Sequence, residues 1–129
     1  MAKLRADIDA VFVTRFDTWH NGAPVLRFPK AESLSPVVTC FIINAVSLLD
    51  EALILLLDNN YPGHPELKWL RNRIEWLDKR RTLNDAPRLK EIANLRNDYA
   101  HELGKYGNLG ELQTILADIE KELHHVGVL

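Results

Sequence analysis

A short run of polar residues near position 100 holds the side chains best suited to chemistry: Arg96, Asn97, Asp98 and His101. A histidine can take the proton of a ribose 2′-hydroxyl or protonate the leaving oxygen of a phosphodiester. An arginine can hold the non-bridging phosphate oxygens and stabilise the charge that develops on them. Asn97 would add a neutral hydrogen bond, and Asp98 could orient the ring of His101. These residue types predict phosphodiester cleavage in RNA without a metal ion or other cofactor.

The spacing of these residues places them on one predicted helix. Its apolar positions define a face about 120° wide, made of Leu89, Ile92, Leu95, Tyr99 and Leu103. Arg96 lies inside that face, where an unpaired guanidinium is costly unless it meets an acid, a phosphate or a cleft. Asp50 or Glu51 could supply the acid. Two interpretations stay open: a cleft that carries chemistry, or a buried Arg–acid pair beside a surface histidine.

One helix supplies a single histidine, whereas the acid and base roles usually need two groups. Asn97 and His101 are four residues apart on one edge of the helix, so both can contact the same ligand. Two chains packed about a two-fold axis would bring both copies of this edge into one cleft. We therefore expect a homodimer.

The run Arg96-Asn97-Asp98-Tyr99-Ala100-His101 resembles the arginine–x4-to-6–histidine signature of HEPN domains, including the polar residue directly after the arginine. HEPN domains are small α-helical bundles, commonly homodimeric, and many are metal-independent endoribonucleases of toxin–antitoxin, phage-defence and RNA-processing systems. The resemblance spans about residues 35–123. It implies that Arg96, Asn97 and His101 are catalytic, with Glu51 or Asp50 as the acid of the earlier helix and Asp98 and Tyr99 in support.

The sequence departs from one HEPN subfamily at a defined position. Toxins that are silenced by adenylylation carry a tyrosine two residues after the histidine, where this chain has Leu103. Some HEPN relatives are regulators or scaffolds without activity. The resemblance thus implies an endoribonuclease and, as the alternative, a non-catalytic regulatory or binding module.

The apolar spacing is helical along the whole chain and predicts an all-α fold. We expect one domain over residues 1–129, with an N-terminal helix and an irregular, proline-rich arm in residues 1–34 and an up-and-down, HEPN-like bundle in residues 35–125. The helices are predicted at about residues 4–19, 35–58, 65–81, 85–103 and 111–124.

The second of these helices is apolar nearly all round, and it is long enough to span a bilayer. Asn44, Asp50 and Glu51 oppose that interpretation, because each charge costs roughly 2.5–3.5 kcal/mol at a bilayer centre. We predict a buried core helix, no membrane contact, and excess apolar surface for a dimer. Five of its polar residues fall within an arc of roughly 60°, as a solvated stripe or a seam lining a cleft: Cys40, Asn44, Ser47, Glu51 and Asp58.

Composition and charge limit the other possibilities. The 129 residues include 16 Lys and Arg against 18 Asp and Glu, a net charge of −2, so bulk positive charge cannot drive nucleic-acid binding. The single cysteine, Cys40, excludes an internal disulfide or a multi-cysteine metal site and favours a reducing, cytoplasmic setting. It is expected to be a buried, inert thiol.

Positive charge is concentrated between residues 66 and 90, a segment with eight basic and four acidic residues. Trp69 and Trp76 fall near one side of the helix predicted there, so their rings could stack on single-stranded bases. Core tryptophans and a solvated helix end are the alternative. The predicted RNA-contacting residues are Lys68, Arg71, Arg73, Lys79, Arg80 and Arg81. Beside RNA and a second copy of the chain, a cognate antitoxin or regulatory protein is an expected partner.

Overall fold

The computed structural model describes residues 1–7, 35–102 and 104–129, and all regular structure within them is helical. Four helices form the bundle: α2 (Ser35–Asn60), α3 (Leu70–Lys79), α4 (Ala86–His101) and α5 (Leu109–His125). The predicted all-α class is confirmed. Most of the predicted N-terminal helix and the arm after it lie outside the described residues.

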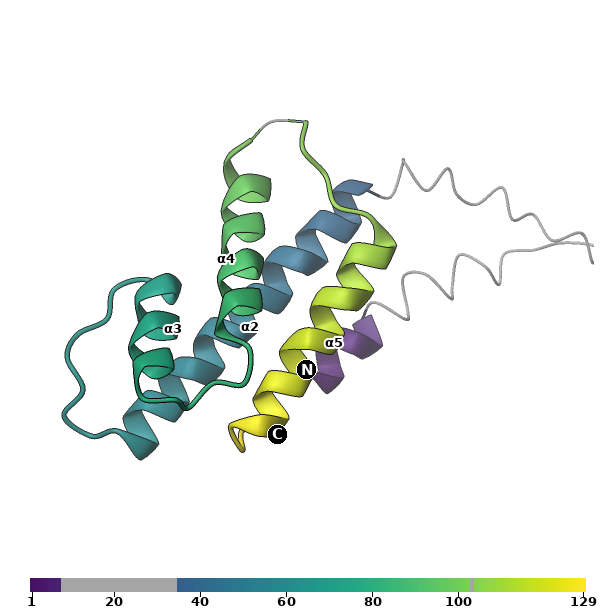
Figure 1. Ribbon diagram of the computed structural model, residues 1–129. Helices are drawn as coiled ribbons and strands as arrows, with labels where there is room; N and C mark the ends of the chain where they lie inside the picture. The colour runs from purple at the N-terminus through teal and green to yellow at the C-terminus, as the bar shows by residue number, and fades with distance from the viewer. Residues whose placement is uncertain (8–34, 103) are drawn as a thin grey trace, which may run out of the picture.

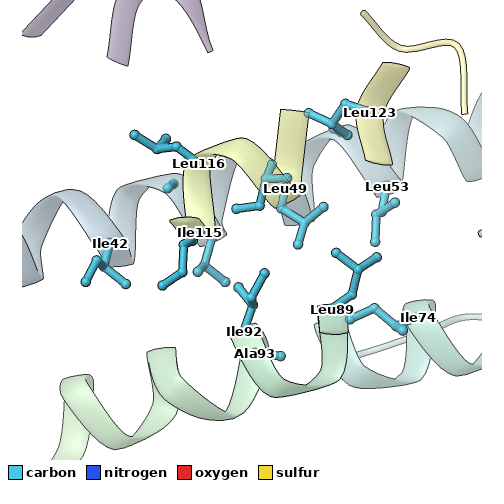
Figure 2. Close-up of a cluster of buried hydrophobic side chains, with 14 of the residues drawn as sticks. Ile42, Leu49, Leu53, Ile74, Leu89, Ile92, Ala93, Ile115, Leu116 and Leu123 are labelled. Carbon is cyan, nitrogen blue, oxygen red and sulfur yellow. The ribbon is translucent and has the colours of Figure 1, made fainter. Parts of the chain in front are cut away.

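Helix α2 is the element around which the others are arranged. It runs diagonally through the molecule, with α3 and α4 on one side and α5 on the other (Figure 1). Each of α3, α4 and α5 packs against it. Its fully buried side chains include Ile42, Leu49 and Leu53, which meet Ile92 of α4 and Ile115 of α5 in one continuous core (Figure 2).

Helix α2 is also long and apolar enough to cross a membrane by length and composition alone, a test that the core helix of a soluble protein passes as well. The packing of α3, α4 and α5 against it is the arrangement predicted for a core helix. Its outer side carries the predicted polar stripe, and all five members are exposed. Cys40 is among them, so the expectation of a buried thiol is wrong.

The first residues of the chain join the bundle. Residues 2–7 are helical, and Leu4 is buried in the core. Arg5 Nε donates to Glu120 Oε1 of α5 over 3.1 Å. This short segment lies beside α5 in Figure 1.

Two contacts fix the start of α4. Asp85 is its N-cap and accepts a hydrogen bond from the backbone N–H of Arg88 at 3.2 Å. The buried carboxylate of Glu122, on α5, accepts the backbone N–H groups of Asn84 at 2.9 Å and Asp85 at 2.8 Å. This second contact, which we call the Glu122 clamp, cannot be predicted from local sequence, because it joins positions 37 and 38 residues apart.

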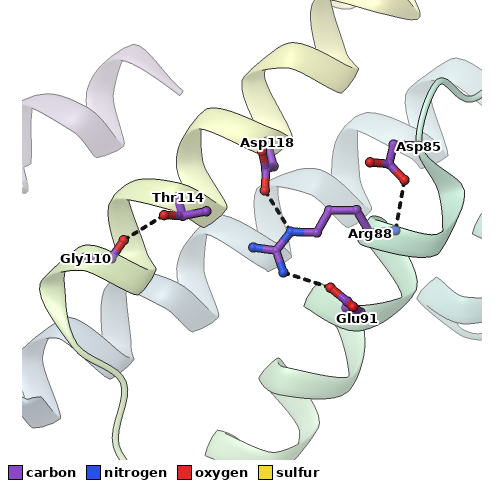
Figure 3. A network of polar contacts seen from close by, with 6 residues as sticks. All are labelled: Asp85, Arg88, Glu91, Gly110, Thr114 and Asp118. Atoms are coloured by element: carbon purple, nitrogen blue, oxygen red, sulfur yellow. Dashed lines mark hydrogen bonds and ion pairs between the residues drawn. The ribbon is translucent and has the colours of Figure 1, made fainter.

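Arg88 ties the same end of α4 to α5. Its Nε donates to Asp118 Oδ2 at 2.7 Å, and its Nη1 donates to Glu91 Oε2 at 3.0 Å (Figure 3). The guanidinium therefore has a carboxylate on each of two sides. Together with the contact of Glu122, these bonds anchor the start of α4 to α5.

The helix boundaries agree with the predictions to within two residues for α2, α4 and α5. Helix α3 differs, since it begins at Leu70 and not near Pro65. Residues 61–69 form an irregular connection, in which Tyr61 shares a hydrogen bond with Thr82 at 2.6 Å and His64 Nε2 lies 2.9 Å from Asp58 Oδ1. These tertiary contacts hold the chain in a non-helical course.

Candidate functional site

A pocket of about 530 Å³ opens where α2, α4 and the start of α3 meet. Helix α4 supplies Ala93, Asn94, Arg96 and Asn97, which lie on one face because they are spaced by three and four residues. From α2 come Val46, Ser47 and Asp50, and the segment before and within α3 supplies Lys68, Trp69, Leu70, Arg71, Asn72 and Arg73. Two of the three predicted catalytic residues, Arg96 and Asn97, therefore line a pocket.

Arg96 has no carboxylate partner among the residues that the structure describes. Its one hydrogen bond runs from Nη1 to Oδ1 of the neighbouring Asn97, at 3.4 Å. Asp50, one of the two acids expected to pair with it, instead accepts from Arg73 Nη1 at 2.6 Å. Glu51, the other, is exposed on α2 and does not line the pocket. A half-buried guanidinium thus lines the pocket with no carboxylate paired to it in the part of the chain that the structure describes.

The pocket lining carries four cationic side chains, Lys68, Arg71, Arg73 and Arg96, and one carboxylate, Asp50. The first turn of α3 adds to this positive charge, since its backbone N–H groups have no acceptor within the helix. Trp69, its N-cap, gives no side-chain capping bond. A pocket with this balance favours an anion that makes several hydrogen bonds.

His101 lies on the same helix as Arg96 and Asn97 but outside the pocket lining. It is the last residue of α4, exposed, and one turn beyond Asn97, which places it about 6 Å further along the helix axis. Asp98 does not orient it, because that carboxylate accepts from Lys105 Nζ at 3.3 Å. An extended ligand that leaves the pocket along α4 would next meet the imidazole of His101.

Tyr99, predicted in a supporting role, faces away from the pocket. Its hydroxyl donates to Glu111 on α5. Burial of the phenol, together with this hydrogen bond, raises the pKa of Tyr99 to about 12. The residue links α4 to α5 and thereby supports the helix that carries the motif.

The six predicted RNA-contacting residues divide into two groups. Lys68, Arg71 and Arg73 line the pocket, whereas Lys79, Arg80 and Arg81 lie at the opposite end of α3, roughly 15 Å away for ten helical residues. Arg80 stacks on Trp76, with its Cζ 3.2 Å from the ring centroid. The two tryptophans are therefore not equivalent, since Trp76 is covered and Trp69 is exposed.

Sequence reasoning missed the amides of the pocket, Asn72 and Asn94. Asn94 lies three residues before Asn97, a spacing that places it on the same face of α4 and could have indicated it. Asn72 could not be found in this way, because the start of α3 was misplaced. Within the described residues, no group of three His, Cys, Asp or Glu side chains is arranged to hold a metal ion.

No family model, curated protein or solved structure matches this chain. The resemblance to HEPN domains thus depends on the motif residues and on the helical architecture alone.

Proposed function

We propose that this protein is a HEPN-like, metal-independent endoribonuclease whose site is built on α4. The observation that carries the proposal is Arg96, half-buried in a pocket of excess positive charge and without a carboxylate partner among the described residues. A structural arginine would have its acid in place, as Arg88 has. A guanidinium held open in this way matches the planar, bidentate recognition of a phosphate.

In this mechanism Arg96 and Asn97 hold the non-bridging oxygens of the scissile phosphate, and His101 acts on the protons. The imidazole takes the proton of the 2′-hydroxyl, and the freed oxygen attacks the phosphorus. The bond from phosphorus to the 5′-oxygen then breaks, and that oxygen receives a proton from a second group. The products carry a 2′,3′-cyclic phosphate and a 5′-hydroxyl.

A second copy of the chain would supply the second proton donor, as the same histidine of its own α4. The outer side of α2 offers apolar surface for such pairing, since Leu55 is 57% exposed and Ile54 is 36% exposed. Light scattering at micromolar concentration tests this part of the proposal. A monomer would exclude a composite site and require another proton donor within one chain.

The test of activity is incubation of the purified protein with a mixed RNA pool in EDTA, beside His101→Ala and His125→Ala. His125 is a matched control, because it is also an exposed histidine at the end of a helix. Cleavage that His125→Ala retains and His101→Ala loses, with cyclic-phosphate ends, supports the proposal. Equal cleavage by all three proteins would refute the role of His101.

A non-catalytic RNA-binding module is the second candidate, and the position of His101 favours it. The imidazole lies outside the pocket, and no described residue orients it through a hydrogen bond. In that case the wild-type protein binds RNA without cutting it, and His101→Ala binds equally well. Arg96→Gln would still weaken binding, because the pocket contact is lost.

A further inference from the structure

Trp69 is the least explained large side chain near the pocket. Trp69 is 63% exposed, lines the pocket, and directly precedes the first residue of α3. Within residues 1–7, 35–102 and 104–129, the ring is not among the side chains packed against the hydrophobic core, and Lys68 Nζ lies 5.1 Å from its centroid. Trp76, by contrast, is enclosed by Tyr61, His64 and Arg80. Exposure of one aromatic residue is ordinary by itself; its place in the lining of a cationic pocket is what makes the ring suited to stacking on a base.

The backbone next to the ring is anchored to the core helix. Arg73 donates to Asp50 Oδ1 on α2 at 2.6 Å, and its Nη2 donates to the carbonyl oxygen of Lys68 at 3.5 Å. The Arg73 side chain is only 13% exposed. This arginine therefore joins the backbone beside Trp69 to the long core helix. A backbone anchored before binding loses little conformational entropy when a ligand arrives, so the ordering cost is limited to the side chain of Trp69.

The remaining pocket groups determine what can lie on that ring. With Asp50 paired to Arg73, the charges free to meet a ligand are those of Lys68, Arg71 and Arg96, although Arg71 also contacts Glu75 at 3.3 Å. The amides of Asn72, Asn94 and Asn97 can each donate and accept. A flat ring, several cations and amides that both donate and accept match a nucleotide with its base, sugar and phosphate.

We infer that this pocket binds one unpaired nucleotide of an RNA strand, with the base stacked on Trp69 and the adjacent phosphate held by Arg96, so that the protein selects single-stranded RNA. The volume of about 530 Å³ lies within the range of sites that enclose small molecules. A base in a duplex is stacked between its neighbours and cannot reach the ring. The inference rests on the proposed function for its ligand, RNA, and adds how that ligand is chosen.

The test measures binding in the His101→Ala background, so that RNA stays intact. A fluorescein-labelled single-stranded RNA and the same strand in a blunt duplex are titrated by fluorescence anisotropy. We expect Trp69→Ala to weaken single-strand binding by roughly 5- to 100-fold, the cost of losing one stacked base. Trp69→Phe should restore most of the affinity. Tyr106→Ala is the matched control, since Tyr106 is 55% exposed and lies outside the pocket lining.

Two results would overturn the inference. One is single-strand affinity that Trp69→Ala and Tyr106→Ala leave equally unchanged. The other is a duplex that binds as tightly as the single strand and shows the same dependence on Trp69. Competition with a free mononucleotide distinguishes the source of the ligand, because displacement at equal concentration would assign the pocket to free nucleotides and overturn a site for an RNA strand.

Failure of the proposed function gives a different pattern. If wild-type protein cleaves no RNA while Trp69→Ala still weakens single-strand binding, the nuclease proposal fails and the nucleotide pocket stands. If cleavage depends on His101 and no binding depends on Trp69, the nuclease stands and the pocket inference fails.

Discussion

The two ends of α4 show opposite uses of the same residue type. At the start of the helix, Arg88 meets Asp118 and Glu91, and Glu122 accepts the backbone groups next to it. Ile92, in the middle of α4, is fully buried. Beyond it, Arg96 faces the pocket and has no carboxylate partner among the described residues. Satisfied charge fixes the helix, and unsatisfied charge remains available to a ligand. The difference separates an arginine that stabilises the helix from one that is available to a ligand.

The largest expected effect comes from exchanging the two arginines for glutamine one at a time. Arg96→Gln should lower RNA cleavage by roughly 10²–10³-fold, the usual result of removing one group that stabilises transition-state charge. Its free energy of unfolding should change by less than about 0.5 kcal/mol. Arg88→Gln should lower that free energy by about 1 kcal/mol and leave cleavage unchanged. Initial rates and urea denaturation measure both quantities. Loss of stability in Arg96→Gln with loss of cleavage in Arg88→Gln would contradict these two roles.

Glu122→Ala should give the largest loss of stability. The substitution leaves the backbone N–H groups of Asn84 and Asp85 without their acceptor in a site where Glu122 is 2% exposed. We expect the free energy of unfolding to fall by about 3 kcal/mol in Glu122→Ala, and by less in Glu122→Gln, which keeps one acceptor oxygen. Glu91→Gln, at an exposed position, is the control. A change below 1 kcal/mol in Glu122→Ala would mean that the clamp contributes little.

The hydroxyl of Tyr99 predicts a pH dependence at alkaline pH. Its pKa is about 12 in the folded protein and about 10 when unfolded. Between these values the unfolded chain binds fewer protons, so stability that is fully present below pH 10 falls as the pH rises toward 12. Urea denaturation midpoints determined from pH 9 to 11.5 measure this decline in stability. Tyr99→Phe should remove this part of the decline; an unchanged profile would contradict the assignment.

The smallest effect concerns His64, which braces the connection before the pocket. Its hydrogen bond to Asp58, and then its bond to the Pro65 carbonyl oxygen, raise its pKa above the usual 6.5. The stability it contributes is therefore present below pH 6.5 and is lost as the pH rises through the raised pKa. NMR titration of the imidazole checks the direction. In His64→Gln, unfolding between pH 6 and 8 should depend less on pH; a pKa below 6.5 would refute the bond.

The fold could be predicted where local signals decide it. Asp85 as N-cap with Pro87 in the first turn marks the start of α4, because capping and the proline ring act within a few residues. The start of α3 differs from the prediction, because residues 61–69 form an irregular connection. One of its contacts joins Tyr61 to Thr82, 21 residues away and beyond α3, which local signals do not reveal.

The residue types of the candidate site could be predicted from the sequence, but which acid pairs with which arginine could not. Asp50 and Glu51 are neighbours in sequence, yet about 100° apart around a helix. Asp50 turns toward α3 and pairs with Arg73, while Glu51 faces solvent. Which acid meets which arginine depends on how the helices are rotated against one another, and that rotation is set by buried contacts such as Glu122.

The clamp of Glu122 on the first turn of α4 also has a consequence for the order of synthesis. Asn84 and Asp85 leave the ribosome well before Glu122, so the nascent α4 has no acceptor for these two N–H groups until α5 has emerged and docked. The start of α4, the helix that carries Arg96 and His101, thus gains this contact only after α5 has been synthesised, 37 to 38 residues later.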